Sequence, residues 1–239
     1  MPETGKCCFG HAQEPEVHVN DVALLLYDGG LQQFSANSRV EHCVFIIAHD
    51  YVSQASASWI AHLAYSIQNI GKCIVQSKVL AQTGSTKQTD AMRREAVVYN
   101  PQMPYRKVAP TIIVVDWAGP AMTLYQTAAY SARVVGRILA EKLAMHRQFV
   151  LKRPNIHCIG EGKFSKVFSG GVNILICLLL LLGLGAHVCG VAGSNYALGE
   201  FMRISALDPS RPLFETSDDG IEVPFDDRLD STDAKFVDV

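Results

Sequence analysis

The sequence lacks several features that would place it in a common class of protein. None of its seven cysteines forms a C-x-x-C pair, so the spacing indicates neither a zinc finger nor a thioredoxin-type redox site. The formal net charge is -2 and no basic stripe with interleaved aromatic residues is present, so we expect no nucleic-acid partner. The N-terminal stretch carries Glu3, Glu14 and Glu16 without an apolar run, so no secretory signal peptide is visible.

Apolar residues, by contrast, are abundant. They make up 49% of 239 residues and charged residues 18%, which is typical of a folded globular chain long enough for one full domain. Cys158 and Cys189 lie in apolar runs, and we expect them to be small core residues. Carboxylates outnumber basic residues strongly over residues 215–239, which indicates a solvated acidic surface or, alternatively, a cation site.

Apolar runs and periodic stripes predict alternating strands and helices. The predicted strands are residues 22–27, 43–47, 111–115, 155–159 and 202–207, and the predicted helices are residues 56–70 and 123–146. Thr123 is the expected N-cap of the second helix. This alternation predicts an α/β fold, with a mainly parallel sheet and flanking helices. Function in such sheets lies at the carboxyl ends of strands, where Asp116, Gly160 and Asp208 fall.

Residues 72–110 interrupt the alternation. They are polar, mildly basic and broken by Pro101 and Pro104. A connection of this length is uncommon inside a small domain. We therefore expect an insertion or a disordered loop there and assign it no fold.

A second interruption separates a short strand from a helix of small residues. Residues 154–160 (P-N-I-H-C-I-G) and 183–193 (G-L-G-A-H-V-C-G-V-A-G), joined directly, would read almost as the serine-hydrolase turn G-x-S-x-G. Residues 161–182 stand between them, and the serine position holds Gly183, which has no hydroxyl to attack an ester. An apolar insertion at this turn predicts a displaced helix and a poorly folded or unstable product, or else an altered transcript.

The apolar insertion leaves a membrane alternative open. Residues 167–199 contain no Lys, Arg, Asp or Glu, and Lys163 and Lys166 would bias their flank to the cytoplasm. The continuous apolar core, residues 174–182, is nevertheless too short to span a bilayer. We therefore favour an insertion in a buried turn over a transmembrane helix.

Four stretches resemble the pancreatic-type lipases, the animal neutral lipases with an α/β-hydrolase fold. They are V-F-I-I-A-H-D-Y (44–51); I-V-V-D-W with R-V-V-G (113–117 and 133–136); the two pieces around the second interruption; and I-S-A-L-D-P with R-L-D-S-T-D-A-K-F-V-D-V (204–209 and 228–239). The resemblance implies a single partial lipase domain over residues 1–239, incomplete at its C-terminus. It also implies hydrolysis of triacylglycerol or phospholipid esters at a lipid–water interface, and an extracellular location.

The resemblance also assigns roles to residues of this chain. Asp208 takes the position of the catalytic acid, Gly183 that of the nucleophile, and the backbone N–H groups of Tyr51 and Leu184 those of the oxyanion hole. No histidine follows Asp208 to act as the base, so we expect no ester turnover from this polypeptide. His187 belongs to the helix after the turn, where we expect a packed or a surface histidine rather than a substitute base.

Asp50 stands where the family has glycine. Beside a developing oxyanion, its carboxylate would oppose the negative charge unless it pointed to solvent.

The resemblance implies no cofactor for the reaction, but it implies a structural calcium ion. The family's ligands correspond to the carbonyl of Arg228 and the carboxylates of Asp230 and Asp233, with Asp226 standing in for a family glutamate. Oxygen ligands of this kind suit a hard cation.

Three functions fit these observations. The first is a lipid ester hydrolase family member that is inactive as written. The second is a non-catalytic lipid-binding or storage relative, like the yolk proteins of the family that lack the serine. The third is a membrane-anchored fragment built on residues 174–182.

Overall fold

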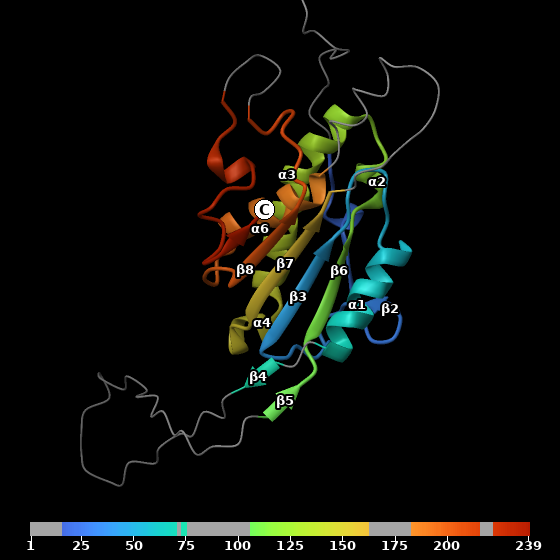
Figure 1. Ribbon diagram of the computed structural model, residues 1–239, viewed down its shortest axis with the longest axis vertical. Helices are drawn as coiled ribbons and strands as arrows, with labels where there is room; N and C mark the ends of the chain where they lie inside the picture. The colour runs from blue at the N-terminus through green and yellow to red at the C-terminus, as the bar shows by residue number, and fades with distance from the viewer. Residues whose placement is uncertain (1–15, 71–72, 76–105, 163–182, 216–221) are drawn as a thin grey trace, which may run out of the picture.

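A seven-stranded sheet forms the centre of the molecule. The computed structural model describes residues 16–70, 73–75, 106–162, 183–215 and 222–239 (Figure 1). The strands of the sheet are β1 (Ala23–Tyr27), β2 (Leu31–Gln33), β3 (Cys43–Ala48), β6 (Thr111–Asp116), β7 (Asn155–Glu161), β8 (Arg203–Leu207) and β9 (Val237–Asp238). Their order is β2-β1-β6-β3-β7-β8-β9. Strands β6 to β9 in this order pair in parallel, whereas β1 is antiparallel to β2 and β6.

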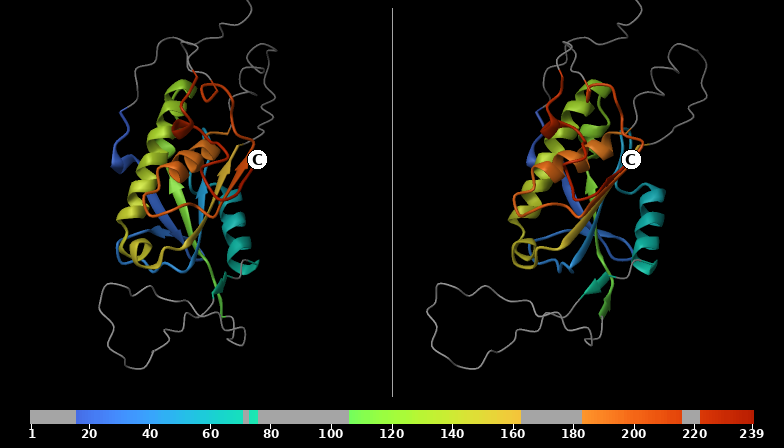
Figure 2. Two further views of the ribbon diagram at one scale, coloured as in Figure 1. Left: turned by 90° about the vertical axis from the view of Figure 1, so that its left-hand side faces the viewer. Right: turned by 60° about the vertical axis from the view of Figure 1, so that its left-hand side comes forward.

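Helices cover both faces of this sheet (Figures 1 and 2). The helices are α1 (Ser58–Ile70), α2 (Ala118–Ala121), α3 (Tyr125–Met145), α4 (Arg147–Lys152) and α6 (Leu184–Ser194), with two 3-10 turns, η1 (Val19–Asp21) and η2 (Phe225–Asp227). α3 and α6 pack against each other on one face, and α1 covers the other. Ile60 and Ala64 of α1 form a separate apolar cluster with Ile47, Ile112 and Val114 of the sheet. This three-layer arrangement confirms the predicted α/β-hydrolase-like fold.

The predicted strands and helices are present, with ends that differ by one or two residues. The placement of the α3 cap at Thr123 is wrong. Leu124 holds the N-cap position without a side-chain hydrogen bond, and the Thr123 hydroxyl donates to the Pro120 carbonyl at 2.8 Å. β2, α2 and α4 are not predictable from the sequence pattern, because each is too short to show a periodic apolar stripe.

The segment 72–110, to which the sequence assigns no fold, contains two short strands at its ends. β4 (Cys73–Val75) and β5 (Arg106–Val108) pair antiparallel, so the two ends of the segment lie together just before β6. Residues 76–105 lie outside the described residues, and the insertion or loop expected there stays a prediction.

β7 and α6 meet in direct contact. A Cβ on Gly160 would overlap the carbonyl of Gly185, so only glycine permits this approach of strand to helix. Cys158 and Cys189 are fully buried, as expected, but they are also joined in a disulfide that bonds β7 to α6. The expected displacement of the helix is therefore wrong: α6 packs behind β7 despite the interruption.

The residues that flank the second interruption lie at one point. A Cβ on Gly162 would come within 2.8 Å of the Gly183 Cα, although twenty residues separate the two glycines in the chain. Residues 163–182, which carry the predicted apolar insertion and its membrane alternative, lie outside the described residues. Among the residues that are described, none of the helices combines the length and apolarity that a membrane crossing requires.

Candidate functional site

The carboxyl ends of β3, β7 and β8 bring the candidate residues to one edge of the sheet. The loop after β3, the point where Gly162 after β7 meets Gly183 before α6 (the joint), and the turn after β8 supply them. They are His49, Asp50, Tyr51, Gly183, Leu184, Asp208 and Ser210. This is the edge at which parallel α/β sheets place their functional groups.

The Asp50 carboxylate occupies the N-terminus of α6. Its Oδ1 accepts hydrogen bonds from the backbone N–H groups of Gly183 and Leu184, each at 2.9 Å, and the residue is fully buried. Free N–H groups at a helix start carry partial positive charge and stabilise an anion. The exception that the sequence left open, an Asp50 side chain that points to solvent, is wrong, because the carboxylate is buried on the two donors. Asp50 is itself the anion that these donors hold.

His49 and Trp117 fix the loop that carries Asp50. The Trp117 backbone N–H donates to His49 Nε2 at 3.2 Å, so Nδ1 carries the proton and donates to the Asp50 carbonyl at 2.9 Å. The Trp117 indole N–H donates to the His49 carbonyl at 2.9 Å, and the two rings stack 5.4 Å apart. Both residues are fully buried, so the loop has a rigid base.

Two tyrosines line the same edge. Tyr51 and Tyr125 meet edge to face at 5.6 Å, and the Tyr51 hydroxyl donates to the Thr123 carbonyl at 3.1 Å. The Tyr125 hydroxyl lies 2.5 Å from the Ser210 hydroxyl. Burial raises the pKa of Tyr125 and the nearby Asp50 charge raises it further, although the Ser210 hydrogen bond lowers it. Tyr125 therefore stays a neutral hydroxyl at physiological pH.

Gly183, at the nucleophile position, has a backbone conformation that excludes a side chain. Its φ of 114° and ψ of 24° lie in the left-handed region that favours glycine. A Cβ there would overlap the Asp208 carbonyl oxygen and the Ser210 nitrogen, and would lie 2.8 Å from the Pro209 carbonyl carbon. A serine therefore cannot be placed at this position unless the turn after β8 moves.

Asp208, at the position of the catalytic acid, turns its backbone toward the joint. Its φ is 51°, an uncommon value for a residue with a side chain, and the residue is exposed. Its carbonyl oxygen lies against Gly162 and Gly183. No side chain of the described residues hydrogen-bonds its carboxylate.

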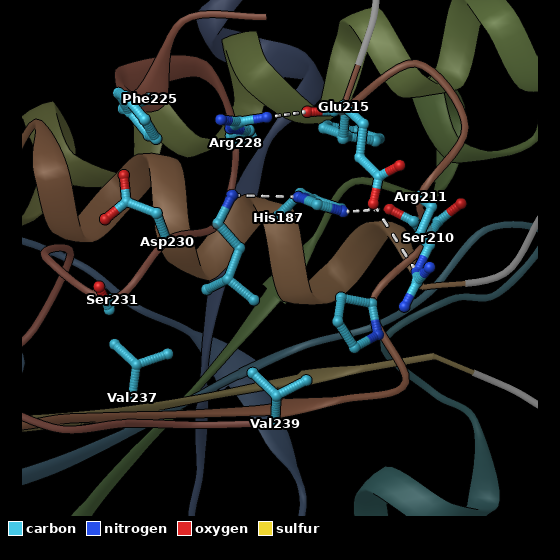
Figure 3. A pocket seen from close by; sticks show the side chains of 13 residues that line it. His187, Ser210, Arg211, Glu215, Phe225, Arg228, Asp230, Ser231, Val237 and Val239 are labelled. Atoms are coloured by element: carbon cyan, nitrogen blue, oxygen red, sulfur yellow. Dashed lines mark hydrogen bonds and ion pairs between the residues drawn. The ribbon is translucent and has the colours of Figure 1, made fainter.

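His187 packs inside the molecule, which is one of the two outcomes that the sequence left open. Its Nδ1 accepts from the Leu229 backbone N–H at 3.1 Å, and its Nε2–H donates to the Ser210 carbonyl at 2.6 Å (Figure 3). The ring stacks on Phe214 with centroids 3.5 Å apart. Burial lowers the pKa of His187 to about 3, against the opposing effect of its hydrogen bond to Ser210. A neutral imidazole thus ties α6 to two separate loops.

A cavity of about 400 Å³ lies beside His187, between the turn after β8 and the loop after η2. Figure 3 shows Arg228 and Glu215 above His187, and Val237 and Val239 below it. Arg228 pairs with Glu222 at 3.0 Å and Arg211 with Glu215 at 3.8 Å, so the cavity has an ion-paired end and an apolar end.

Arg228 is one of the three predicted calcium ligands. Its guanidinium donates to the Phe214 carbonyl at 3.2 Å and to the Glu222 carboxylate at 3.0 Å, and it lies over the Phe225 ring at 4.7 Å. The side chain thus binds the two loops around the cavity together. Only the backbone carbonyl of Arg228 is assigned to calcium.

The other two predicted ligands form a turn of their own. Asp230 Oδ1 accepts from the N–H and hydroxyl of Thr232, and Asp233 Oδ2 accepts from the Asp230 N–H at 2.7 Å. Asp233 Oδ1 is buried without a hydrogen-bond partner. Burial raises the pKa of Asp233 to about 7, and the charges of Asp230 and Asp226 add to this effect. Across the described ranges, no three Asp, Glu, His or Cys side chains group as a metal site.

Comparison with known proteins agrees with this geometry. The family model described as Lipase matches residues 176–239. A putative endothelial lipase of Crotalus adamanteus is 36% identical over 137 residues, which are 56% of this chain and 22% of that protein. The pancreatic triacylglycerol lipase of Myocastor coypus is 26% identical over 206 residues, 86% of this chain and 31% of that protein. Lipase member H of Rattus norvegicus is 33% identical over 129 residues, which are 54% of this chain and 22% of that protein.

The sheet order and the joint of strand, glycine and helix after β7 define an α/β-hydrolase-like protein. The matches to lipases narrow the assignment: they support a member of the pancreatic-type lipase family, a family of lipid ester hydrolases. The chain spans less than a third of the length of the three relatives described above.

Proposed function

We propose that this chain is a non-hydrolysing member of the lipid ester hydrolase family. The observation that supports the proposal is the pair of 2.9 Å hydrogen bonds from Gly183 and Leu184 to Asp50 Oδ1. Ester hydrolysis on this scaffold requires a hydroxyl nucleophile at the joint and free N–H donors for the developing oxyanion. Gly183 supplies no hydroxyl, and the donors already hold a carboxylate.

The electrostatic effect of Asp50 is large on the scale of catalysis. Loss of one oxyanion donor alone slows hydrolysis by about 10²–10³-fold in a serine protease of a different fold. Here Leu184 N–H, the donor next to the nucleophile position, is engaged by a buried negative charge. A second negative charge at this site would be repelled rather than stabilised, because burial strengthens the interaction between like charges.

A fluorophosphonate probe tests the proposal, because it labels only an activated serine. We expect no labelling of the purified chain and no fatty acid release from a triacylglycerol emulsion or from phospholipid vesicles. A pancreatic triacylglycerol lipase, assayed in parallel, serves as the positive control. Stoichiometric labelling, or fatty acid release that copurifies with the chain, would refute the proposal.

Lipid binding without hydrolysis is the function that we propose such a chain retains. The cavity beside His187 supports this, because Val237 and Val239 offer an apolar wall for an acyl chain and the ion-paired groups at the other end offer hydrogen bonds to a polar head. Val52 and Leu124, at the carboxyl edge of the sheet, are 63% and 78% exposed, and such side chains favour contact with a lipid–water interface.

Flotation of the chain with a lipid emulsion tests this binding function. We expect the wild-type chain to float with the emulsion and a Val52→Ser/Leu124→Ser variant to float less. The membrane-anchored alternative depends on residues 174–182, which lie outside the described residues. It predicts that the expressed chain resists carbonate extraction, whereas an interfacial protein is released.

The location and the calcium ion are carried over from the family as proposals. The disulfide between Cys158 and Cys189 supports an extracellular location, because such bonds persist in oxidising compartments. The buried, unpaired Asp233 Oδ1 supports a structural calcium held by Asp230, Asp233 and the Arg228 carbonyl. A cation there would stabilise the charged form of Asp233, which burial disfavours.

A further inference from the structure

A second cavity lies at the opposite edge of the sheet from the candidate ester site. It is formed by the segment before β3 and by α4, which precedes β7, so it lies near the amino ends of these strands (Figure 1). Its volume is about 500 Å³. The side chains that matter here are Asn37, Arg39, Arg147, Gln148, Leu151 and Lys152, and we name it the basic cavity.

The basic cavity carries an excess of positive charge. Three cationic side chains line it and no carboxylate does. Arg39 is paired with Glu41 at 2.8 Å, which offsets one of the three charges. Within the part of the chain that the structure describes, neither Arg147 nor Lys152 has an acidic partner at ion-pair distance. Two positive charges therefore stay uncompensated, in a chain whose formal net charge is -2.

The base of the basic cavity is rigid. Val40 is fully buried, its N–H donates to Gln148 Oε1 at 3.2 Å, and its carbonyl accepts from the Lys152 ammonium. Behind it, Phe34 stacks on His146 at 4.6 Å, which joins the same two segments again. Groups held in place in this way lose little conformational entropy when a ligand binds.

We propose that the basic cavity binds a phosphate group, carried on a phospholipid headgroup or free in solution. Phosphate offers several acceptor oxygens and two negative charges, which match the guanidinium donors of Arg39 and Arg147 and the ammonium of Lys152. Asn37 and the Gln148 amide nitrogen add neutral donors. Leu151, 69% exposed at the rim, suits the glycerol and acyl part of a headgroup lipid.

The site is independent of the proposed function at the carboxyl edge. Because the two sites lie at opposite ends of β3 and β7, phosphate in the basic cavity does not compete with lipid beside Asp50. Failure of phosphate binding would leave the proposal of a non-hydrolysing lipase relative intact. Detection of ester hydrolysis would likewise leave the basic cavity unaffected.

Titration of the purified chain with inorganic phosphate, at constant ionic strength set with chloride, tests the proposal. We expect saturable NMR shifts in the backbone amides of residues 36–41 and 147–152. The Arg39→Gln/Arg147→Gln variant should bind about tenfold more weakly, the loss expected for two charge-assisted contacts at an exposed site. The matched control is Arg137→Gln/Lys235→Gln, which removes two exposed cations that line neither cavity and should bind as the wild type does.

Vesicles distinguish the two sources of phosphate. Co-sedimentation with phosphatidylcholine vesicles that contain phosphatidic acid, reversed by inorganic phosphate, assigns the cavity to a headgroup. Phosphate binding without co-sedimentation assigns it to free phosphate. Equal phosphate affinity in the two double variants, or shifts that chloride reproduces, would overturn the proposal. All four side chains replaced in the two double variants are exposed, so circular dichroism should show that both variants fold.

Discussion

Acidification from pH 7 to pH 5 should destabilise the folded chain through His187 by about 2 kcal/mol. The folded chain holds this imidazole neutral, because burial lowers the pKa of His187 to about 3. In the unfolded chain the same group has a pKa of about 6.5. Between these two values the unfolded state binds the extra proton, so the contribution of His187 to stability is complete above pH 6.5 and falls as the pH falls.

The size of the effect follows from the difference between the two values. Each pH unit below 6.5 removes about 1.4 kcal/mol, so pH 5 removes about 2 kcal/mol and pH 3 removes about 5 kcal/mol in total. The geometry explains why the folded state resists the proton. Nδ1 already accepts the Leu229 N–H, so protonation there would break this hydrogen bond and leave a charge against Phe214.

Urea unfolding at pH 7, 6 and 5 measures this effect, with the disulfide kept oxidised. Asp233 titrates in the same range with the opposite sign, since its pKa is raised to about 7 and its protonated form is favoured in the folded state. The comparison must therefore be with His187→Asn, which keeps Asp233 and can still accept the Leu229 N–H. The wild type should lose about 2 kcal/mol more than this variant between pH 7 and pH 5.

His62→Asn is the matched control, because His62 is exposed on α1. Its stability should follow the wild-type profile at every pH. If the wild type and His187→Asn change in stability in parallel between pH 7 and pH 5, the folded chain does not hold His187 neutral. The packing of α6 against the two loops would then need another explanation.

Three further perturbations test the site. Gly183→Ala should lower the free energy of unfolding in urea by about 3 kcal/mol, because the new Cβ overlaps the turn after β8 and the backbone is left-handed. The control, Gly30→Ala, has open space around it and should change this free energy little. Asp50→Asn keeps the shape but removes the charge at the α6 N-terminus, so thermal unfolding should report a loss of about 1–2 kcal/mol. Millimolar calcium should raise the Tm of the wild type but not of Asp233→Asn, and an equal rise in both would exclude Asp233 as a ligand.

The local elements of this fold are predictable from the sequence. Continuous apolar runs of five or six residues become the buried strands β3 and β6, and the stripe with helical spacing becomes α3. Such patterns depend on neighbours within one turn or one strand, so they can be identified without knowing the rest of the chain. The order of lipase-like stretches also predicts the positions of the acid and of the nucleophile, and these two assignments stay predictions.

The chemistry of the site depends on contacts that no local pattern contains. Asp50 meets Leu184 across 134 positions of sequence, and the glycine that it replaces suggests only an unfavourable charge. One signal could have predicted this contact, because a carboxylate is favoured at the N-terminus of a helix. Whether the Asp50 side chain points there, however, depends on the contacts of His49 and Trp117, which fix its loop.

The amino-acid sequence by itself determined the strands, the long helices, the lipase-like order of motifs and the glycine at the nucleophile position. Only the tertiary structure decided that Asp50 neutralises the helix start, that Cys158 bonds Cys189, and that Arg39 and Arg147 share a cavity. The physical reason is the separation along the chain over which each interaction acts. Propensity and periodicity act between residues close in the chain, whereas charge pairing, disulfide bonding and cavity formation depend on which distant segments the folded core brings together.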